Sequence, residues 1–499
     1  MNVKNGININ NNLIALLAIL LTGLFFRVYD LGGESIWLDE RCSVWFASLN
    51  LSDIFFLQGE KNPPLYYIIL HWWINLFGDS ETSIRFPSVI FGFLSIFMIY
   101  KIGNQLFDKE VGLLSSLFSG LSVFHLRYSQ EARTYSLCVF LTLLSIYFFI
   151  RLIEDRSFKY LIGYTLASTL LMYSHLYGLF IIISQNIYLV VLFFLSKELF
   201  RLNIKRWILA QFLLIVLFIP WIQIFIAQTF GFVKGDTWIP IPSLLSIIKS
   251  FGAYSSRGIL LLLLFLSLLP FSIIKYEGIG TGIDRRNIFK SIKTYCQNIH
   301  LLNTNKVLLL LVWLLTPIIL PFTVSLFSTP IYATKYTIVS SPAFYLLIAK
   351  GVSNISHKYL KVTVISIIIV LSLVYIREYY TKIDKEQWRE VANYIDTNAK
   401  NDDLLLFNAS YCQQVFDYYS KETELTRKPF PMGSRNVDKE VIKELAPTVE
   451  GHKRVWVILA HSGDKNKLIA KKLIETYDLS FHREYVGIKI ALFEMKDHY

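Results

Sequence analysis

Two adjacent carboxylates, Asp39 and Glu40, follow the first apolar segment of the chain. Carboxylates just outside a membrane can take a proton from a hydroxyl group or hold a divalent cation. Aspartate is also a favoured helix N-cap, so a solvated acidic turn is the structural alternative. We treat Asp39 and Glu40 as candidate catalytic residues of a long first loop, residues 30–83.

A second group of charges lies in the short loop 127–133, between two apolar segments. Charged side chains at a membrane edge are costly and are often functional. In one interpretation Glu131 acts with Asp39, and Arg127 or Arg133 contacts an anionic group such as phosphate. The alternative is a simple ion pair between Glu131 and an arginine in the headgroup layer.

Two further polar residues stand at the ends of apolar segments, His175 and Lys335. His175 can be a metal ligand, a proton carrier or a hydrogen-bonded structural residue. Lys335, followed by Tyr336, can bind a lipid phosphate or can simply extend its ammonium group to the water.

A stiff turn interrupts the first loop, where Lys61 and Asn62 precede two prolines. The aromatic stretch that follows, Leu65–Phe77, is too short to cross a bilayer comfortably. We expect it to lie in the membrane interface, where its tryptophans are favoured. His71, in the same stretch, is expected to be a packed interface residue.

Composition indicates which elements position these residues. Of the 499 residues 54% are hydrophobic and only 17% are charged, against about 25% charged in a soluble domain. Mean hydropathy is +0.46. The chain is therefore expected to be a membrane protein with several spans.

The net charge of +12 gives no sign of a nucleic-acid partner, because the excess lies in the hydrophobic part. Residues 377–499 hold 20 basic and 20 acidic side chains.

Apolar runs predict about eleven spans. They are 13–29, 84–100, 111–126, 134–150, 160–176, 178–196, 207–226, 258–274, 307–327, 337–352 and 360–376. Alternate loops are rich in Lys and Arg, and such loops face the cytoplasm. The N-terminus is then inside. The segments expected on the outer side of the membrane are the loops 30–83, 127–133 and 227–257, a turn near 328–336 and the tail from 377.

The sequence thus divides into a membrane domain, 1–376, and an extracytoplasmic domain, 377–499. The apolar pattern of residues 377–499 predicts a small α/β domain. Its expected helices are Arg389–Ala399 and Leu468–Tyr477, and its expected strands are Leu404–Phe407, Val455–Ala460, Arg483–Val486 and Ile488–Phe493. Of the four cysteines only Cys42 and Cys412 are expected outside, where they could pair.

Taken together, these segments resemble the GT-C membrane glycosyltransferases, and most closely glycosyltransferase family 39, the protein O-mannosyltransferase and aminoarabinose-transferase-like group. The resemblance covers most of the chain. It rests on Trp37–Glu40, Asn62–Tyr67, Phe77–Ser80, Arg85–Ser88, Tyr128–Tyr135, Tyr173–His175, Lys335-Tyr336 and Trp388–Ala392, in that order and spacing.

The resemblance implies a polyprenyl-phosphate sugar donor and chemistry at the outer membrane face. It implies that Asp39, with Glu40 beside it, is the catalytic base or a metal-associated carboxylate, and that Glu131 is a second acidic site residue. Relatives often have Lys or His directly before the two prolines. Because this chain has Asn62 there and Lys61 one residue earlier, Arg133 or Lys335 is expected to supply the charge that meets the phosphate.

A transfer of this kind needs a base for the acceptor hydroxyl and positive charge for the leaving phosphate. One base is enough for a single displacement that inverts the anomeric centre. A divalent metal ion is a candidate cofactor, with Asp39, Glu131 and His175 as its candidate ligands. The candidate substrate-binding residues are Lys61, Asn62, Arg133, His175, Lys335 and Tyr336.

Three other classes remain open. A flippase or transporter of lipid-linked sugars favours internal repeats and charges at mid-membrane. A non-catalytic scaffold would not need Asp39 and Glu131 to converge. An oligosaccharide polymerase or ligase would use a large late outer loop, for which only 227–257 is sizeable, with one acidic residue, Asp236. The expected location is the plasma membrane of a bacterium. The acceptor, whether protein, lipid or glycan, is not readable from the sequence.

Overall fold

The computed structural model describes residues 11–56, 62–155, 157–195, 197–231, 239–273, 304–422 and 424–496. Its contacts divide the chain into two compact units. The first contains Met1–Tyr29, Leu49–Gly78 and Ser83–Tyr380, and the second contains Asp30–Ser48, Asp79–Thr82 and Thr381–Tyr499. The start of the first loop therefore packs with the C-terminal residues.

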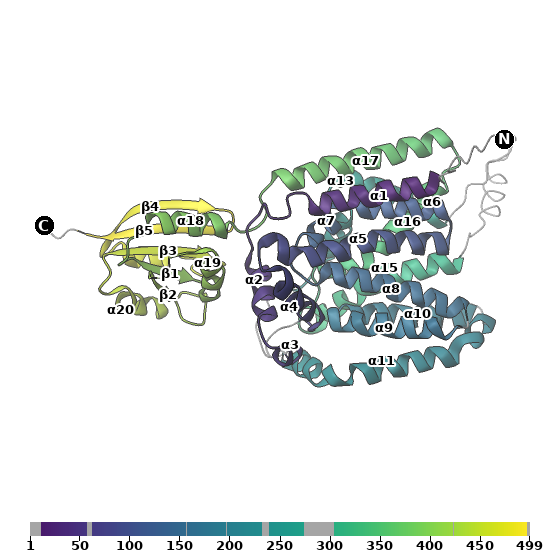
Figure 1. Ribbon diagram of the computed structural model, residues 1–499, viewed down its shortest axis with the longest axis horizontal. Coiled ribbons are helices and arrows are strands. Elements are labelled where there is room, and N and C mark those ends of the chain that lie inside the picture. Colours follow the sequence, from purple (N-terminus) through teal and green to yellow (C-terminus); the bar gives the residue numbers. More distant parts are fainter. Residues whose placement is uncertain are drawn as a thin grey trace, which may run out of the picture. The chain divides into compact units, whose positions relative to one another are not determined.

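The first unit consists of helices, and its long helices run along one another (Figure 1). They are α1 (Asn11–Val28), α3 (Leu51–Phe55), α4 (Leu65–Phe77), α5 (Glu81–Leu106), α6 (Lys109–Gly120), α7 (Val123–Ser129), α8 (Tyr135–Glu154), α9 (Phe158–Ser174), α10 (Gly178–Leu195), α11 (Lys197–Gly231), α12 (Leu244–Tyr254), α13 (Ile259–Ile273), α15 (Thr304–Phe327), the 3-10 helix η2 (Tyr336–Ser340), α16 (Ser341–Ser353) and α17 (Lys358–Thr381).

Among the described residues, six helices are long and apolar enough to cross a membrane, and the bent pair α12–α13 would be a seventh span. The six are α1, α5, α8, the part Ile204–Ala227 of α11, the part Asn305–Phe327 of α15, and α17. The protein is thus a multi-pass integral membrane protein. Helices also lie at the other ranges expected to span, but they are shorter.

Three expected segments differ from the structure for local reasons. The run 111–126 is two helices, because α6 ends at Gly120 and Ser122 caps α7 by accepting the His125 N–H. The run 337–352 begins as a 3-10 helix before α16. The loop expected at 227–257 contains α12, which a capping box at Ser243 begins. Asp236 of that loop lies outside the described residues.

The core of the first unit lies around α16, which is buried from Ser341 to Val352 and contacts α6, α13 and α15. Helices α5 and α6 meet closely at Gly103 and Gly112, where a Cβ on Gly103 would lie 2.8 Å from the Cα of Gly112. Small residues permit such close approaches between membrane helices. The expected interfacial stretch forms α4, and its Trp72 and Leu76 are exposed.

The second unit is an α/β domain with a five-stranded sheet in the order β2-β1-β3-β5-β4. The strands are β1 (Leu404–Asn408), β2 (Thr426–Pro429), β3 (Arg454–Ala460), β4 (Tyr477–Tyr485) and β5 (Ile488–Met495). Strand β1 is parallel to β2 and β3, and β5 is antiparallel to β3 and β4. Its helices are α2 (Leu38–Ala47), α18 (Trp388–Asn398), α19 (Gln413–Tyr419), α20 (Leu445–Val449), α21 (Leu468–Leu473), and the 3-10 helices η3 (Ser410–Cys412) and η4 (Val441–Glu444).

Alternate strand residues fill a hydrophobic core on each face of this sheet. Leu405 and Phe407 pack in one core with Trp388 of α18, and Leu404 and Leu406 pack in the other with Leu445 of α20. Figure 1 shows the helices on both sides of the strands. The α/β prediction is confirmed.

Two details of this domain were not predicted correctly. The expected helix Leu468–Tyr477 ends at Leu473, and Tyr477 begins strand β4 instead. Strand β2 was not expected, because its sequence Thr426–Pro429 has no apolar pattern.

Cys42 and Cys412 both belong to the second unit, and neither they nor Cys138 of α8 form a disulfide with another described cysteine. Cys296 lies outside the described residues.

Candidate active site

The charged loop after α7 is buried and internally bonded. Glu131 is 2% exposed, and its Oε1 lies 3.3 Å from Nε of Arg127. The Arg133 N–H donates to the Glu131 carbonyl over 2.8 Å. The ion pair that the sequence left as an alternative is therefore present, with a buried glutamate and a partly exposed arginine.

Hydrogen bonds connect this loop to two other predicted segments. The Tyr66 hydroxyl of α4 lies 3.0 Å from Ser88 Oγ of α5, which donates to the Arg133 carbonyl over 3.3 Å. Thr134 donates from Oγ1 to the carbonyl of Ser174, at the end of α9, over 2.8 Å. The polar motifs quoted from distant parts of the sequence thus meet at one place in the first unit.

His175 lies at this junction and is buried. Its Nδ1 accepts the backbone N–H of Tyr177 over 3.1 Å. In the neutral ring this leaves the proton on Nε2. Among the described residues Nε2 has no hydrogen-bond partner. A buried donor without a partner is unusual in a folded protein and indicates a position for a ligand or a water molecule.

Aromatic rings and cations surround His175. Its ring centroid lies 4.9 Å from that of Tyr336 and 6.0 Å from that of Tyr135. The Lys335 ammonium lies 5.8 Å from the ring centroids of both tyrosines. Arg133 and Lys335 lie within electrostatic range of His175. The structure therefore brings together four predicted residues, and their charges suit an anionic group.

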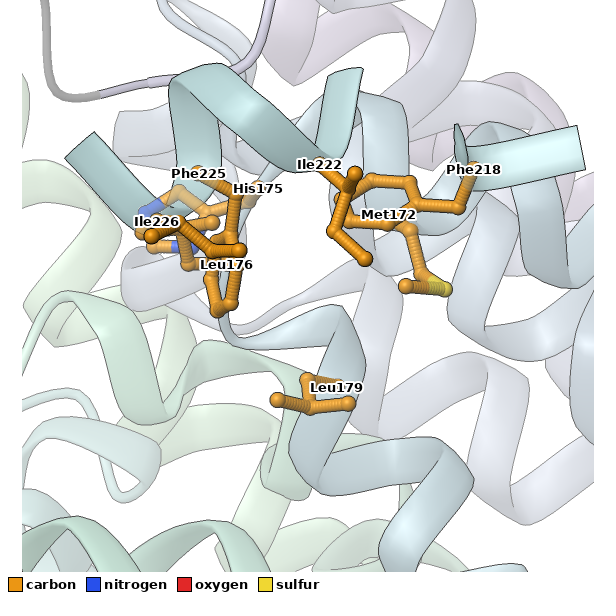
Figure 2. Close-up of a pocket in the computed structure, with 8 residues that line it drawn as sticks. All are labelled: Met172, His175, Leu176, Leu179, Phe218, Ile222, Phe225 and Ile226. Atoms are coloured by element: carbon orange, nitrogen blue, oxygen red, sulfur yellow. The ribbon is translucent and has the colours of Figure 1, made fainter. Parts of the chain in front are cut away.

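A cavity of about 220 Å³ adjoins His175 between α9, α10 and α11. Figure 2 shows His175 at one side of it and Leu179, Phe218 and Ile222 among its other walls. Apart from the histidine, every lining side chain is apolar, the remainder being Met172, Leu176, Phe225 and Ile226. The cavity suits a hydrocarbon chain.

The structure says little about phosphate binding by Lys61 and Asn62, the two residues before the prolines. Asn62 donates from Nδ2 to the Tyr67 hydroxyl over 3.5 Å, which is a weak contact. Lys61 lies outside the described residues, so its proposed contact with phosphate stays a prediction.

Asp39 and Glu40 belong to the second unit, in the first turn of α2. The Glu40 side chain is fully buried, and its Oε1 lies 3.3 Å from Nζ of Lys385. Asp39 is half-buried. The two adjacent carboxylates therefore have different surroundings, and Glu40 resembles a structural anchor more than a group that meets a substrate.

Sequence reasoning missed Glu386, which connects three parts of the second unit. Its Oε1 lies 2.6 Å from Nε2 of His461, and its Oε2 accepts the indole N–H of Trp388 over 2.6 Å. The Leu38 N–H, directly before Asp39, also reaches Oε2 over 3.4 Å. The Glu386 carboxylate accepts a hydrogen bond from the protonated His461 ring, which raises the pKa of His461 above its ordinary value. The nearby Trp388–Ala392 motif was the available signal.

The candidate metal ligands do not form a metal site as they stand. Within the described part of the chain, no three His, Cys, Asp or Glu residues lie close enough to share a metal ion. His175 uses the lone pair of Nδ1 for Tyr177, and Glu131 already pairs with Arg127. Asp39 lies in the other unit, so the convergence of Asp39 with Glu131 stays a prediction.

The comparison with protein families agrees with the motifs. Residues 61–224 match the family model described as dolichyl-phosphate-mannose-protein mannosyltransferase. No curated protein sequence matches the chain.

Solved structures match nearly the whole chain. ArnT from Cupriavidus metallidurans in the apo state has a TM-score of 0.60 at 10% identity and covers 96% of this chain and 97% of its own. The same protein bound to undecaprenyl phosphate has a TM-score of 0.57 at 12% identity, with the same coverage.

The archaeal oligosaccharyltransferase AglB from Archaeoglobus fulgidus, in complex with an inhibitory peptide and a dolichol-phosphate, has a TM-score of 0.56 at 10% identity. It covers 98% of this chain and 74% of its own. At such low identities the likeness establishes the fold. The chain is a multi-pass membrane protein with the GT-C fold, and the predicted resemblance to this group of membrane glycosyltransferases is confirmed.

Proposed function

We propose that the protein transfers a sugar from a polyprenyl-phosphate-linked donor to an acceptor hydroxyl group. The reaction takes place on the extracytoplasmic face, by a single displacement that inverts the anomeric centre. The protein resides in the plasma membrane of a bacterium, with its N-terminus in the cytoplasm. The convergence of Arg133, His175, Lys335 and Tyr336 beside an apolar cavity carries this proposal.

The donor phosphate binds at this convergence. When the glycosidic bond breaks, negative charge builds up on the phosphate, and cations placed in advance stabilise it. Lys335 and Arg133 supply positive charge, and the Nε2–H of His175 donates a hydrogen bond. Tyr336 packs against His175 and Lys335 and fixes their positions.

The apolar cavity receives the first part of the prenyl chain. Its neighbour His175 is the polar end of an otherwise hydrocarbon surface, which matches a lipid whose phosphate is joined directly to an apolar tail. ArnT was solved with undecaprenyl phosphate and AglB with a dolichol-phosphate, which supports a donor of this class.

Asp39 is the general base that accepts the proton of the acceptor hydroxyl. Glu40 holds the segment in place through its buried pair with Lys385. Glu131 orients Arg127 and the backbone of the second loop. A divalent metal ion stays a candidate cofactor, and it would supply Lewis acidity. Asp39, Glu131 and His175 stay its candidate ligands, although the Nδ1 lone pair of His175 already accepts the Tyr177 N–H.

The test is sugar transfer in proteoliposomes that contain defined polyprenyl-phosphate sugars. Asp39→Asn removes the charge but keeps the shape. Asp53→Asn, in α3 of the same loop, is the matched control. We expect transfer to fall at least about a hundredfold in Asp39→Asn and to stay unchanged in Asp53→Asn.

Normal transfer by folded Asp39→Asn would refute the role of Asp39. Movement of the donor across the bilayer without any transfer to added acceptors would favour the flippase alternative.

A further inference from the structure

His461 stands at a position of the second unit where α/β proteins commonly place functional groups. It follows β3 directly, and β3 and β2 flank β1 in parallel. From β1 the chain continues to β2 on one side and then to β3 on the other. Sites in such sheets lie outside the carboxyl ends of the strands where this change of direction occurs.

The backbone at His461 is also unusual. Its φ of 52° lies in the left-handed region, which residues with a side chain rarely adopt. Such conformations are maintained by the surrounding structure and concentrate at functional sites. Here the conformation is accompanied by a short contact, because His461 Nε2 lies 2.6 Å from Glu386 Oε1.

The same glutamate reaches the segment that carries Asp39. The Leu38 N–H donates to Glu386 Oε2 over 3.4 Å, and Ser35 Oγ donates to the Glu386 carbonyl over 2.5 Å. Glu386 is nearly buried, whereas His461 is 37% exposed. Glu386 therefore connects the His461 imidazole to two residues on the N-terminal side of Asp39, to Leu38 through its carboxylate and to Ser35 through its backbone carbonyl.

We propose that His461 is a positioning residue for Asp39. Held by Glu386, its imidazole fixes the position of the segment that carries Asp39. This inference rests on the proposed role of Asp39 as the base. It assigns to the C-terminal domain a part in positioning the proposed base.

The charges around His461 favour its protonated form. Glu386, before α18, raises the pKa of His461 by its hydrogen bond, and the Asp39 charge on α2 raises it further. Partial burial and Arg435, in the loop after β2, lower it. Tyr411 of η3 also faces the ring, with centroids 6.3 Å apart, and has a raised pKa. His461 therefore stays protonated to a higher pH than a free histidine.

The experiment compares His461→Gln, His461→Lys and Glu386→Gln in the full-length protein. His482→Gln is the matched control, since His482 lies 3.8 Å from Glu484 on exposed strand β4 of the same unit. We expect His461→Gln and Glu386→Gln to lower kcat for transfer about tenfold with an unchanged KM for the donor. His461→Lys keeps the charge, so we expect it to recover part of kcat without the alkaline decline of the native pH profile.

A second measurement needs no turnover. Titration of His461 by NMR in histidine-labelled protein should give a lower pKa in Glu386→Gln than in the native protein, because the hydrogen bond with Glu386 raises this pKa. The His482 titration should be unchanged. Native kcat and pH profile in folded His461→Gln, or an unaltered His461 titration in Glu386→Gln, would overturn the inference.

Failure of the proposed function can be distinguished from failure of this inference. Normal transfer by Asp39→Asn would refute the role of Asp39 as the base, while the titration still reports whether Glu386 holds His461.

Discussion

Lys385 Nζ lies 3.3 Å from Glu40 Oε1 and 3.5 Å from Oε2, and the side chains are 6% and 0% exposed. Removing one partner of a buried pair leaves an uncompensated charge. We expect Glu40→Ala to destabilise the protein by about 3 kcal/mol, measured by denaturant unfolding in detergent. Glu440→Ala breaks the exposed pair with Lys443 and should have no measurable effect. Equal stability of the two variants would show that the buried pair is not formed.

Gly92 provides a test of the second loop. A Cβ at this position would lie 2.1 Å from Ser129 Oγ and 3.0 Å from Nε of Arg27, which itself donates to Ser129 over 3.1 Å. Gly92→Ala should therefore displace the loop that carries Glu131 and Arg133. We expect a loss of about 1–3 kcal/mol in stability together with reduced transfer.

The matched control is Gly252→Ala in α12, where a Cβ meets no atom within 4 Å. This variant should be as stable as the native protein or slightly more stable. Native activity in folded Gly92→Ala would contradict the assigned role of the loop.

Lys335 should govern the affinity for the donor phosphate. Losing one charged hydrogen bond costs about 1.5–3 kcal/mol, so Lys335→Gln should raise the Kd for a polyprenyl phosphate at least about tenfold. The Kd of Lys335→Arg should lie between those of the native protein and of Lys335→Gln. Lys249→Gln, on the exposed side of α12, serves as the control. An unchanged Kd in Lys335→Gln would locate the phosphate elsewhere.

The apolar cavity predicts a dependence on the length of the prenyl chain. Ile222→Phe fills part of the cavity, whereas Ile219→Phe changes an exposed side chain on the same helix, α11. We expect Ile222→Phe to weaken binding of long-chain polyprenyl phosphates but not of a short water-soluble analogue. Equal effects on both ligands would mean that the cavity does not hold the chain.

The raised pKa of His461 predicts that the free energy of unfolding depends on pH. Its folded-state pKa is raised mainly by the Glu386 hydrogen bond. The stabilisation is therefore complete below the unfolded-state pKa of about 6.5 and is lost as the pH rises through the folded-state value. Unfolding of native protein and His461→Gln should differ most at acidic pH and converge at alkaline pH. A constant difference would contradict this linkage.

The sequence predicted elements better than contacts. The helix Leu65–Phe77 was predicted with its observed bounds, because a turn at two prolines and a glycine at 78 delimit an aromatic run. The pattern of basic loops placed Arg133, His175 and Lys335 on one side, which agrees with their convergence. Both inferences use local signals.

The pairing of the first loop with the C-terminal residues could not be predicted in this way. Glu40 and Lys385 carry no periodic signal that relates one to the other, and the interpretation of Glu40 as a catalytic group came from its position beside Asp39. The contact of Arg389 with Glu81, at 3.2 Å, is equally nonlocal. Such pairs depend on the tertiary fold alone.

The second unit combines an early part of the chain with its last part, and this affects the order in which its contacts can form during synthesis. Residues 30–48 belong to it, yet the partners that bury them are synthesised last, since Glu40 and Lys385 are 345 residues apart. During translation the Asp39 segment leaves the ribosome long before its binding surface exists. A chain that stops before the final domain would carry Asp39 on an unsupported segment. Asp39, the proposed base, would then gain its support only after the C-terminal domain has been synthesised.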